Sequence, residues 1–293
     1  MRKISDFYTS LEPGELTGRL RRVRHAALDM DGTLYLGSTL FPFTPPFLEG
    51  LKRSGVGCSF LTNNPSRSVA GYVEKLAGMG IPARREEIYT SALAAIDWLR
   101  RTLPQARRLF VLGTPAMREE FAGAGYARAA DDPADEPDAV VTGFDTTLAY
   151  APACRAAWWI ARGKPWVATN PDRVCPTDLP TVLIDCGSIT RMLAHASGRE
   201  PDAVPGKPDP GMLLGVASRY GVRPGEIAMC GDRIYTDMAA ARAAGALGVL
   251  VLSGEAALDE ALAADPAPDL VVPHVGVFGR LLAEAADGTI QGL

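Results

Sequence analysis

Two aspartates with one residue between them, Asp29 and Asp31, stand directly after a small apolar run and directly before Gly32. Aspartate and glycine are ordinary turn formers, so the pair on its own predicts only a tight reversal of the chain. The same two carboxylates could also do chemistry, because one can act as a nucleophile while the other moves a proton. The rest of the chain decides between these interpretations.

Further polar residues follow other apolar runs in the same way. Thr62 and Asn63 come after GCSFL, Asp232 comes after IAMCG, and Asp237 lies five residues beyond Asp232. Lys207 stands between these groups, at the start of an expected helix. In a doubly wound parallel sheet, ligands bind at the carboxyl ends of the strands. We therefore expect these residues, which are far apart in the sequence, to converge at one edge of a sheet.

The residue types at these positions suit phosphoryl transfer. Several carboxylates close together repel one another unless a cation lies among them, and Mg²⁺ prefers hard oxygen ligands of this kind. A carboxylate can also attack phosphorus and form an aspartyl-phosphate. Lys207 and the hydroxyl of Thr62 offer positive charge and a hydrogen bond to the phosphoryl group, whose charged transition state needs such support.

Short apolar runs alternate with helical stretches, which predicts βαβ units and an α/β fold with a doubly wound parallel sheet. A second series of strand-like runs lies in the middle of the chain: RRLFVLG, PDAVVTGF, KPWVATN and PTVLID. After this series the pattern of the N-terminal part returns. We therefore expect an inserted α/β domain over residues 99–186, within a core domain built from residues 1–98 and 187–293.

The composition is that of an ordinary globular protein, with 47% hydrophobic and 22% charged residues in a chain of 293. The net charge is −4 and there is no long basic block, so neither nucleic acid nor a membrane surface is an expected partner. No uncharged apolar run is long enough to span a bilayer. Five cysteines without C-x-x-C spacing favour reduced thiols. Because the N-terminus shows no apolar targeting segment, we expect a cytoplasmic protein.

Four short motifs resemble, in order and spacing, those of the haloacid dehalogenase (HAD) superfamily of phosphatases: LDMDGTL, LTNN, GKP and GDRIYTD. The middle of the chain is similar to the α/β cap of the subfamily that includes NagD-like sugar and nucleotide phosphatases, p-nitrophenyl phosphatases, phosphoglycolate phosphatases and pyridoxal phosphate phosphatases. The resemblance covers nearly the whole chain. It implies a Rossmann-like HAD core that carries an inserted cap.

The resemblance also implies a role for each acidic residue. Asp29 would be the nucleophile that attacks phosphorus, and Asp31 would be the acid and base that protonates the leaving group and then activates water. Mg²⁺ would be held by the Asp29 side chain, the Asp31 backbone carbonyl and Asp232. Asp237 would orient water bound to the metal.

The remaining site residues are assigned in the same way. Thr62 and Asn63 would bind the transferring phosphoryl group, and Lys207 would offset the negative charge of both nucleophile and phosphate. The cap loop ATNPDRVCPTDLP should face the active site, which makes Arg173 and Cys175 candidates for substrate contact. The alternative is that these two residues only shape the loop.

The implied activity is that of a Mg²⁺-dependent phosphomonoesterase for a small phosphorylated metabolite: a sugar phosphate, phosphoglycolate, a nucleotide or pyridoxal phosphate. Two other functions stay open, a catalytically silent protein that binds a phosphorylated metabolite and a phosphotransferase whose acceptor is not water. Caps of this type often mediate dimers in the family, which implies that the chain can form a homodimer through its cap.

Overall fold

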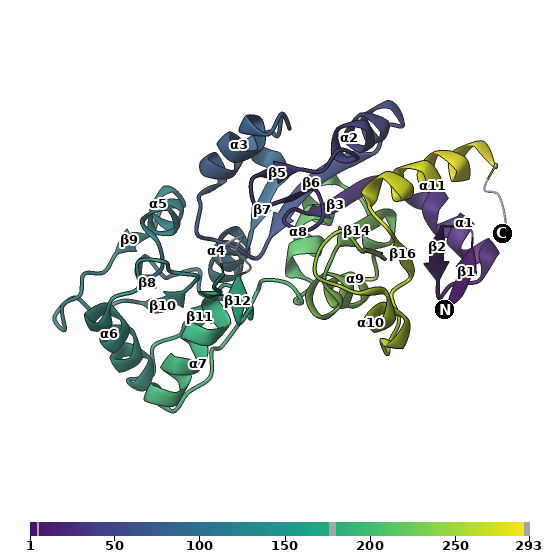
Figure 1. Cartoon of the computed structure of the whole chain (residues 1–293). Coiled ribbons are helices and arrows are strands. Elements are labelled where there is room, and N and C mark those ends of the chain that lie inside the picture. The colour runs from purple at the N-terminus through teal and green to yellow at the C-terminus, as the bar shows by residue number, and fades with distance from the viewer. Residues whose placement is uncertain (5, 176–179, 290–293) are drawn as a thin grey trace. The chain divides into compact units, whose positions relative to one another are not determined.

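The computed structural model describes residues 1–4, 6–175 and 180–289 (Figure 1). It divides into two compact units. The first contains residues 1–61, 77–83 and 208–293, and the second contains residues 62–76 and 84–207. The segment 99–186, predicted as an insertion, lies within the second unit, and its limits stay a prediction.

The first unit is built on a mainly parallel sheet. Within this unit, the strands follow the order β1 (Arg2–Ile4), β2 (Phe7–Thr9), β16 (Leu270–Val272), β15 (Leu247–Val251), β14 (Ile227–Gly231), β3 (His25–Asp29) and β6 (Gly57–Thr62). The strands from β16 to β6 pair in parallel, whereas β1 and β2 are antiparallel additions at the edge. The predicted α/β class with a parallel sheet is therefore confirmed.

The central strands are almost entirely apolar because both of their faces are buried. Ala26, Ala27 and Leu28 of β3 have no exposed surface, and the same holds for all of β14 up to Cys230. Strand β3 pairs with β14 so that Leu28 lies opposite Cys230, and it pairs with β6 so that Asp29 lies opposite Leu61. The polar residues that follow these strands therefore leave the sheet at one edge.

Helices flank this sheet and complete the first unit. They are α1 (Pro13–Arg22), α2 (Thr44–Arg53), α8 (Gly211–Tyr220), α9 (Ala239–Ala244), α10 (Leu258–Ala263) and α11 (Val275–Asp287). Helix α11 packs against both α1 and α2, and α8 packs against α9. Short elements complete the loops: the hairpin of β4 (Tyr35–Leu36) and β5 (Thr39–Leu40), the 3₁₀ turn Pro224–Glu226 and the π-helical turn Ile234–Met238.

The second unit has a parallel sheet of its own, in the order β11 (Trp166–Ala168), β10 (Ala139–Thr142), β8 (Arg108–Leu112) and β9 (Ala127–Arg128). Its helices are α4 (Ser91–Thr102), α5 (Pro115–Gly123), α6 (Tyr150–Ala161) and α7 (Cys186–Ser197). The unit also contains the 3₁₀ turn Arg85–Glu87, β7 (Ile88–Thr90) and α3 (Val69–Gly78) as far as Leu76.

Alternation along β10 gives this second sheet a separate core on each face. Val141 packs into the core formed with α4 and α5, whereas its neighbour Val140 packs into the core formed with α6 and α7. Successive strand side chains point to opposite faces, so one strand can serve both cores. Trp166 is buried in the second of these, and its indole Nε1–H donates to the Thr142 hydroxyl at 3.1 Å.

The segment PTVLID was expected to form a strand, and two of its residues do so, outside the four-stranded sheet. Leu183–Ile184 forms β13, which pairs antiparallel with β12 (Val174–Cys175) in a separate two-stranded ribbon. Both residues of β13 are exposed. A run of apolar residues in the sequence does not distinguish a buried strand from an exposed one. The partner strand β12 is only two residues long.

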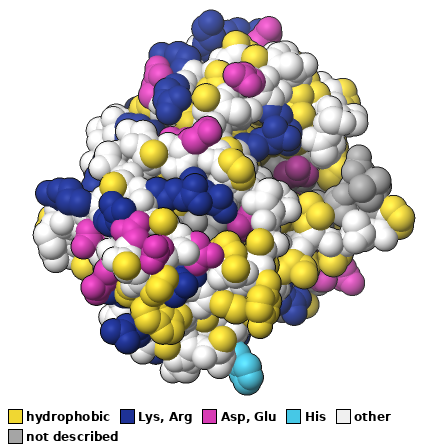
Figure 2. Space-filling model, turned by 90° about the vertical axis from the view of Figure 1, so that its left-hand side faces the viewer, with side chains coloured by type: hydrophobic (Ala, Val, Ile, Leu, Met, Phe, Trp, Pro, Cys, Tyr) yellow, Lys and Arg dark blue, Asp and Glu magenta, His cyan; other side chains and the backbone are white. Residues whose placement is uncertain are grey.

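The outer face of the protein shown in Figure 2 carries basic, acidic and apolar side chains that are interspersed. Some of the charges on the second unit form ion pairs, such as Arg155 with Asp131 and Arg191 with Glu200. No helix within the described residues has the length and apolar character that a membrane crossing would need.

Shortening a side chain at the centre of the first sheet should be costly. Leu28 has no exposed surface, so Leu28→Ala leaves a cavity and is expected to lower the free energy of unfolding by about 3 kcal/mol. Leu262→Ala is the matched control, since Leu262 is 42% exposed and its truncation should cost less than about 0.5 kcal/mol. Equilibrium urea unfolding of both variants measures the difference, and equal costs would contradict the described packing.

Candidate active site

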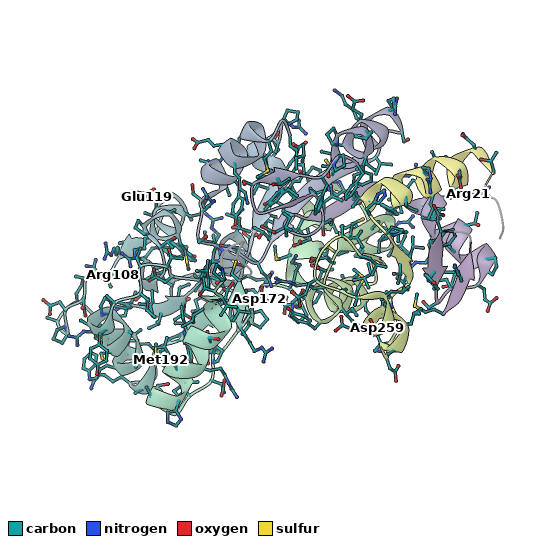
Figure 3. All side chains as sticks on the ribbon, viewed as in Figure 1. Arg21, Arg108, Glu119, Asp172, Met192 and Asp259 are labelled. Carbon is teal, nitrogen blue, oxygen red and sulfur yellow. The ribbon has the colours of Figure 1, made fainter. Side chains whose placement is uncertain are left out.

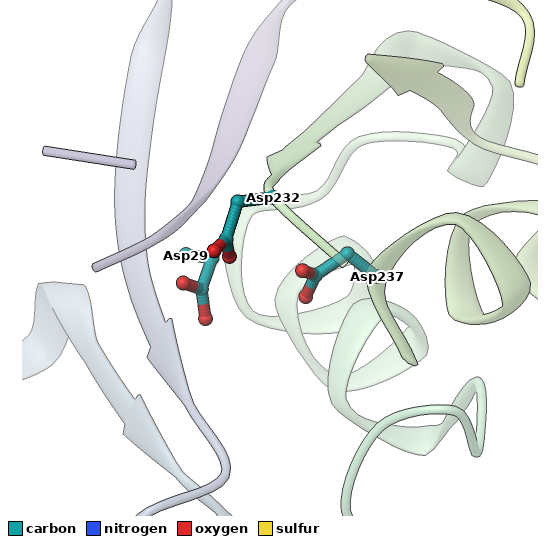
Figure 4. A group of neighbouring side chains, drawn as sticks. All are labelled: Asp29, Asp232 and Asp237. Carbon is teal, nitrogen blue, oxygen red and sulfur yellow. The ribbon is translucent and has the colours of Figure 1, made fainter. Parts of the chain in front are cut away.

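The first unit brings three of the predicted acidic residues together. Asp29 ends β3, Asp232 follows β14 directly, and Asp237 lies in the π-helical turn that comes next. One carboxylate oxygen from each of the three residues lies within 4.8 Å of those of the other two. Figure 4 shows the three carboxyl groups pointing into a shared space. Asp232 and Asp237 are buried and Asp29 is half-buried, so the charges of this acidic cluster are poorly screened by water.

Backbone N–H groups fix two of these carboxylates. The amide of Glu255 donates to Asp232 Oδ2 at 2.7 Å, and the amide of Arg233 donates to Asp237 Oδ2 at 3.1 Å. The main chain of Asp232 is held as well, because its carbonyl accepts from Ala256 at 3.1 Å. Hydrogen bonds to an ionised acceptor are short and strong, so each carboxylate is oriented before any ligand arrives.

Three glycines make room for the acidic cluster. A Cβ on Gly254 would lie 2.0 Å from Asp232 Oδ2, and one on Gly32 would lie 2.2 Å from the same atom. A Cβ on Gly231 would lie 2.3 Å from the carboxyl carbon of Asp237. No side chain fits at these distances, so the backbone itself forms the wall behind the acids.

The donor set of the acidic cluster fits a hard divalent cation. It offers only carboxylate oxygens, and like charges this close repel one another unless a positive charge lies among them. Mg²⁺ binds through one or two protein carboxylates in its usual sites and keeps several waters. The three carboxylates supply this chemistry without any nitrogen or sulfur ligand.

Cys230 lies close to the acidic cluster but offers no thiolate to it. Burial, together with the nearby charge of Asp237, raises the pKa of the Cys230 thiol well above its usual range. The side chain has no exposed surface. Cys230 is therefore a neutral packing residue of β14.

Asp31 stands apart from the three clustered carboxylates. Its side chain is exposed, and Oδ1 accepts a long hydrogen bond of 3.4 Å from the amide of Gly37. The loop around it is shaped by Gly32, which has a φ of +84° and donates its amide to the Tyr35 carbonyl at 2.8 Å. Exposure leaves the Asp31 carboxylate accessible from solvent, and its role as acid and base stays a prediction.

The second unit brings Asn63 and Lys207 together, although they are 144 residues apart in the sequence. The side-chain amide of Asn63 donates to the Lys207 carbonyl at 2.8 Å. Thr62, the last residue of β6, accepts from the amide of Asn64 at 3.1 Å through its hydroxyl. Asn63 and Lys207 are buried, with 7% and 2% of their surface exposed. The phosphate-binding roles of these three residues stay a prediction.

The structure places Arg173 and Cys175 at the β12–β13 ribbon. Arg173 has an exposed side chain, whereas its carbonyl accepts from the amide of Asp185 at 3.0 Å and from the Ser188 hydroxyl at 2.7 Å. Asn64 donates its side-chain amide to the Cys175 sulfur at 3.7 Å. The main chain of Arg173 therefore shapes the loop, and substrate contact by either side chain stays a prediction.

Sequence reasoning missed Asp172, which lies in the same loop as Arg173. Its carboxylate accepts from the Asn63 side chain, with 3.3 Å to each oxygen, and the residue is only 6% exposed. Asp172 is labelled in Figure 3. Its position in the sequence could have pointed to it. The residues TNPD follow the apolar run of β11, just as Asp29 and Asp232 stand at the ends of their apolar runs.

Family comparisons agree with this site. A model of haloacid dehalogenase-like hydrolases matches residues 26–127, and a second, HAD-hydrolase-like model matches residues 204–277. The two ranges cover more than half of the chain and include every acid of the cluster. The chain belongs to the haloacid dehalogenase-like hydrolase family. The resemblance inferred from the four motifs is confirmed.

The chain is similar to phosphatases of this family. It is 29% identical over 253 residues to the ribonucleotide monophosphatase NagD of Escherichia coli K12, covering 86% of this chain and 97% of the relative. Among solved structures, 4-nitrophenylphosphatase from Thermotoga maritima is 34% identical, with a TM-score of 0.84 and coverage of 89% of this chain and 98% of that one. The chain is thus a NagD-like HAD phosphatase.

A third relative was solved with a metal. The structure of glycerol phosphate phosphatase from Mycobacterium tuberculosis in complex with magnesium is 30% identical, with a TM-score of 0.82. The alignment covers 92% of this chain and 79% of that one.

Adding a methyl group behind the acidic cluster should weaken metal binding. Gly254→Ala places a Cβ within 2.0 Å of Asp232 Oδ2, so the carboxylate must move, and we expect a loss of roughly tenfold or more in Mg²⁺ affinity. The affinity is read from the rise in thermal unfolding temperature as Mg²⁺ is added without substrate.

Gly50→Ala is the matched control for this variant. Gly50 lies in α2 and a Cβ there would meet nothing within 4 Å. Its response to Mg²⁺ should equal that of the wild type. A full response to Mg²⁺ in Gly254→Ala would contradict the account of the glycine wall.

Proposed function

We propose that this phosphatase is Mg²⁺-dependent and hydrolyses a small phosphorylated metabolite through an aspartyl-phosphate on Asp29. The observation that carries the proposal is the acidic cluster, in which one carboxylate oxygen each of Asp29, Asp232 and Asp237 lies within 4.8 Å of the others. When bound among these oxygens, Mg²⁺ would neutralise charge and orient the phosphoryl group.

Asp29 acts as the nucleophile in this proposal. One of its carboxylate oxygens bonds to phosphorus while the bond from phosphorus to the ester oxygen breaks. Asp31 gives a proton to the departing oxygen and then takes one from the water that cleaves the aspartyl-phosphate, which releases inorganic phosphate and restores Asp29. The exposure of Asp31 suits a group that must exchange protons with solvent and with different alcohols.

Lys207 and Thr62 stabilise the negative charge of the phosphoryl group in this proposal. The ammonium group and the hydroxyl support the charge on the transferring phosphoryl oxygens, where fixed dipoles and charges act most strongly away from water. Thr62 directly follows Leu61, which pairs with Asp29, and this position along β6 supports its role.

A small phosphate monoester is the proposed substrate. The relatives are named for ribonucleotide monophosphates, 4-nitrophenyl phosphate and glycerol phosphate, which share the phosphate ester and little else. Arg173 has an exposed guanidinium in the loop after β11 and is the proposed contact for the rest of the substrate. Cys175 lies on the same ribbon.

Turnover of p-nitrophenyl phosphate tests the activity. We expect release of p-nitrophenol with Mg²⁺, none with excess EDTA, and a loss of at least about 10³-fold in kcat for Asp29→Asn, because the amide oxygen is a poor nucleophile. Asp259→Asn, an exposed residue of α10, should keep wild-type activity. A folded wild-type protein without turnover on this ester or on a panel of phosphorylated metabolites would overturn the proposal.

Replacing Asp31 should separate the two chemical steps. Asp31→Asn cannot donate a proton, which matters little for p-nitrophenolate, a good leaving group, but it also cannot activate water. We expect a burst of p-nitrophenol of about one equivalent per enzyme, followed by slow turnover as the aspartyl-phosphate accumulates. Glycerol phosphate, whose leaving alkoxide needs the proton, should show no burst. Rapid-quench measurement of both substrates checks this, and equal kinetics would contradict the assigned role.

A further inference from the structure

We propose that Asn63 and Asp172 are positioning residues for Lys207, and that the Asn63 side chain does not bind phosphate. The proposal rests on the role of Lys207 under the proposed function. It assigns a task to Asp172, a residue of the loop between β11 and β12 that the reaction itself does not use.

The hydrogen bonds of Asn63 account for both of its side-chain protons. Its Nδ2 donates to the Lys207 carbonyl at 2.8 Å and to the Asp172 carboxylate, 3.3 Å from each oxygen. All of these neighbouring atoms are acceptors, which fixes the orientation of the amide. A side-chain amide has only two N–H donors, so none is left for a phosphoryl oxygen.

The main chain of Asn63 is held in place as well. Its carbonyl accepts from the Ser91 hydroxyl at 2.6 Å and from the Asn170 side chain at 2.7 Å. Asn63 is only 7% exposed, and both its side-chain Nδ2 and its main-chain carbonyl are bound by other groups of this unit.

Asp172 is fixed independently of Asn63. Its amide donates to the Asn170 side-chain oxygen at 2.9 Å, and its carbonyl accepts from the amide of Gly187 at 2.8 Å. A Cβ on Gly187 would lie 2.1 Å from the Pro171 carbonyl oxygen, so the start of α7 packs directly on this loop. The carboxylate that receives the Asn63 amide therefore has a defined position.

The residue before Lys207 is packed just as tightly. A Cβ on Gly206 would lie 2.4 Å from the Thr169 carbonyl oxygen and 3.0 Å from Asn63 Oδ1. The chain entering Lys207 thus lies against the loop after β11, and the hydrogen bond from Asn63 holds the lysine carbonyl. These contacts fix the main chain of Lys207 and so restrict the positions that its ammonium group can reach. A catalytic charge acts fully only when it is held at the correct place.

Alanine variants test the proposal. Asn63→Ala and Asp172→Ala should each lower kcat/KM for p-nitrophenyl phosphate by roughly ten- to hundredfold, because misplacement of about 1 Å has effects of this size. The double variant should lose no more than the more affected single variant, because both act through one carbonyl contact. Asp172→Asn keeps an acceptor and should recover most of the activity.

A background without the lysine separates positioning from a general structural role. In Lys207→Gln, adding Asp172→Ala should change the residual kcat/KM by less than about twofold, since the group it positions is gone. Asp145→Ala is the matched control, because Asp145 is a buried carboxylate of the same unit, 5% exposed, whose Oδ1 accepts from Thr147. It should keep wild-type kcat/KM.

The outcomes distinguish this inference from the proposed function. No turnover by the wild type overturns the phosphatase proposal itself. Wild-type turnover with full activity in both Asn63→Ala and Asp172→Ala overturns only the positioning inference, as does an undiminished effect of Asp172→Ala in the Lys207→Gln background. Thermal unfolding of every variant is measured alongside. If the alanine variants do not fold, the Asp172→Asn variant decides the question. If folded Asp172→Asn loses as much activity as Lys207→Gln does, the inference is contradicted.

Discussion

The mutual repulsion of three carboxylates is the constraint on which the rest of the site depends. Asp29, Asp232 and Asp237 each place one carboxylate oxygen within 4.8 Å of the others, and two of the three residues are buried. Such a cluster is unfavourable in itself, because like charges repel one another strongly at this distance away from water. The fold holds it with the register of β3 and β14, with backbone amides that donate to the carboxylates, and with glycines where no side chain fits.

The second unit shows the complementary arrangement. Its polar centre is built from neutral amides and hydroxyls around Asn63, together with the buried charges of Lys207 and Asp172. Acid chemistry thus belongs to one compact unit and the lysine to the other. Lys207 directly precedes Pro208, where the chain enters the first unit.

The acidic cluster could be predicted from the sequence because each acid follows an apolar run that forms a parallel strand. Strand ends meet at one edge, and four motifs in order gave the family. A strand was also predicted at PTVLID, but the apolar residues at 183–184 do not reveal that both stay exposed and lie outside the four-stranded sheet. The use of the Asn63 protons could not be predicted, because it depends on Asp172, which lies 109 residues later. The requirement for glycine at position 254 could not be predicted either, because it arises only from the close approach of Gly254 to Asp232.

Calorimetric titration of Mg²⁺ into the substrate-free protein tests the central claim most directly. The account predicts one binding site in the wild type and a large loss of affinity in Asp232→Asn, which keeps the shape of the side chain but removes one of the three charges. Equal Mg²⁺ affinity in the two proteins, or no binding by the folded wild type, would contradict the assignment of the acidic cluster as the metal site of this phosphatase.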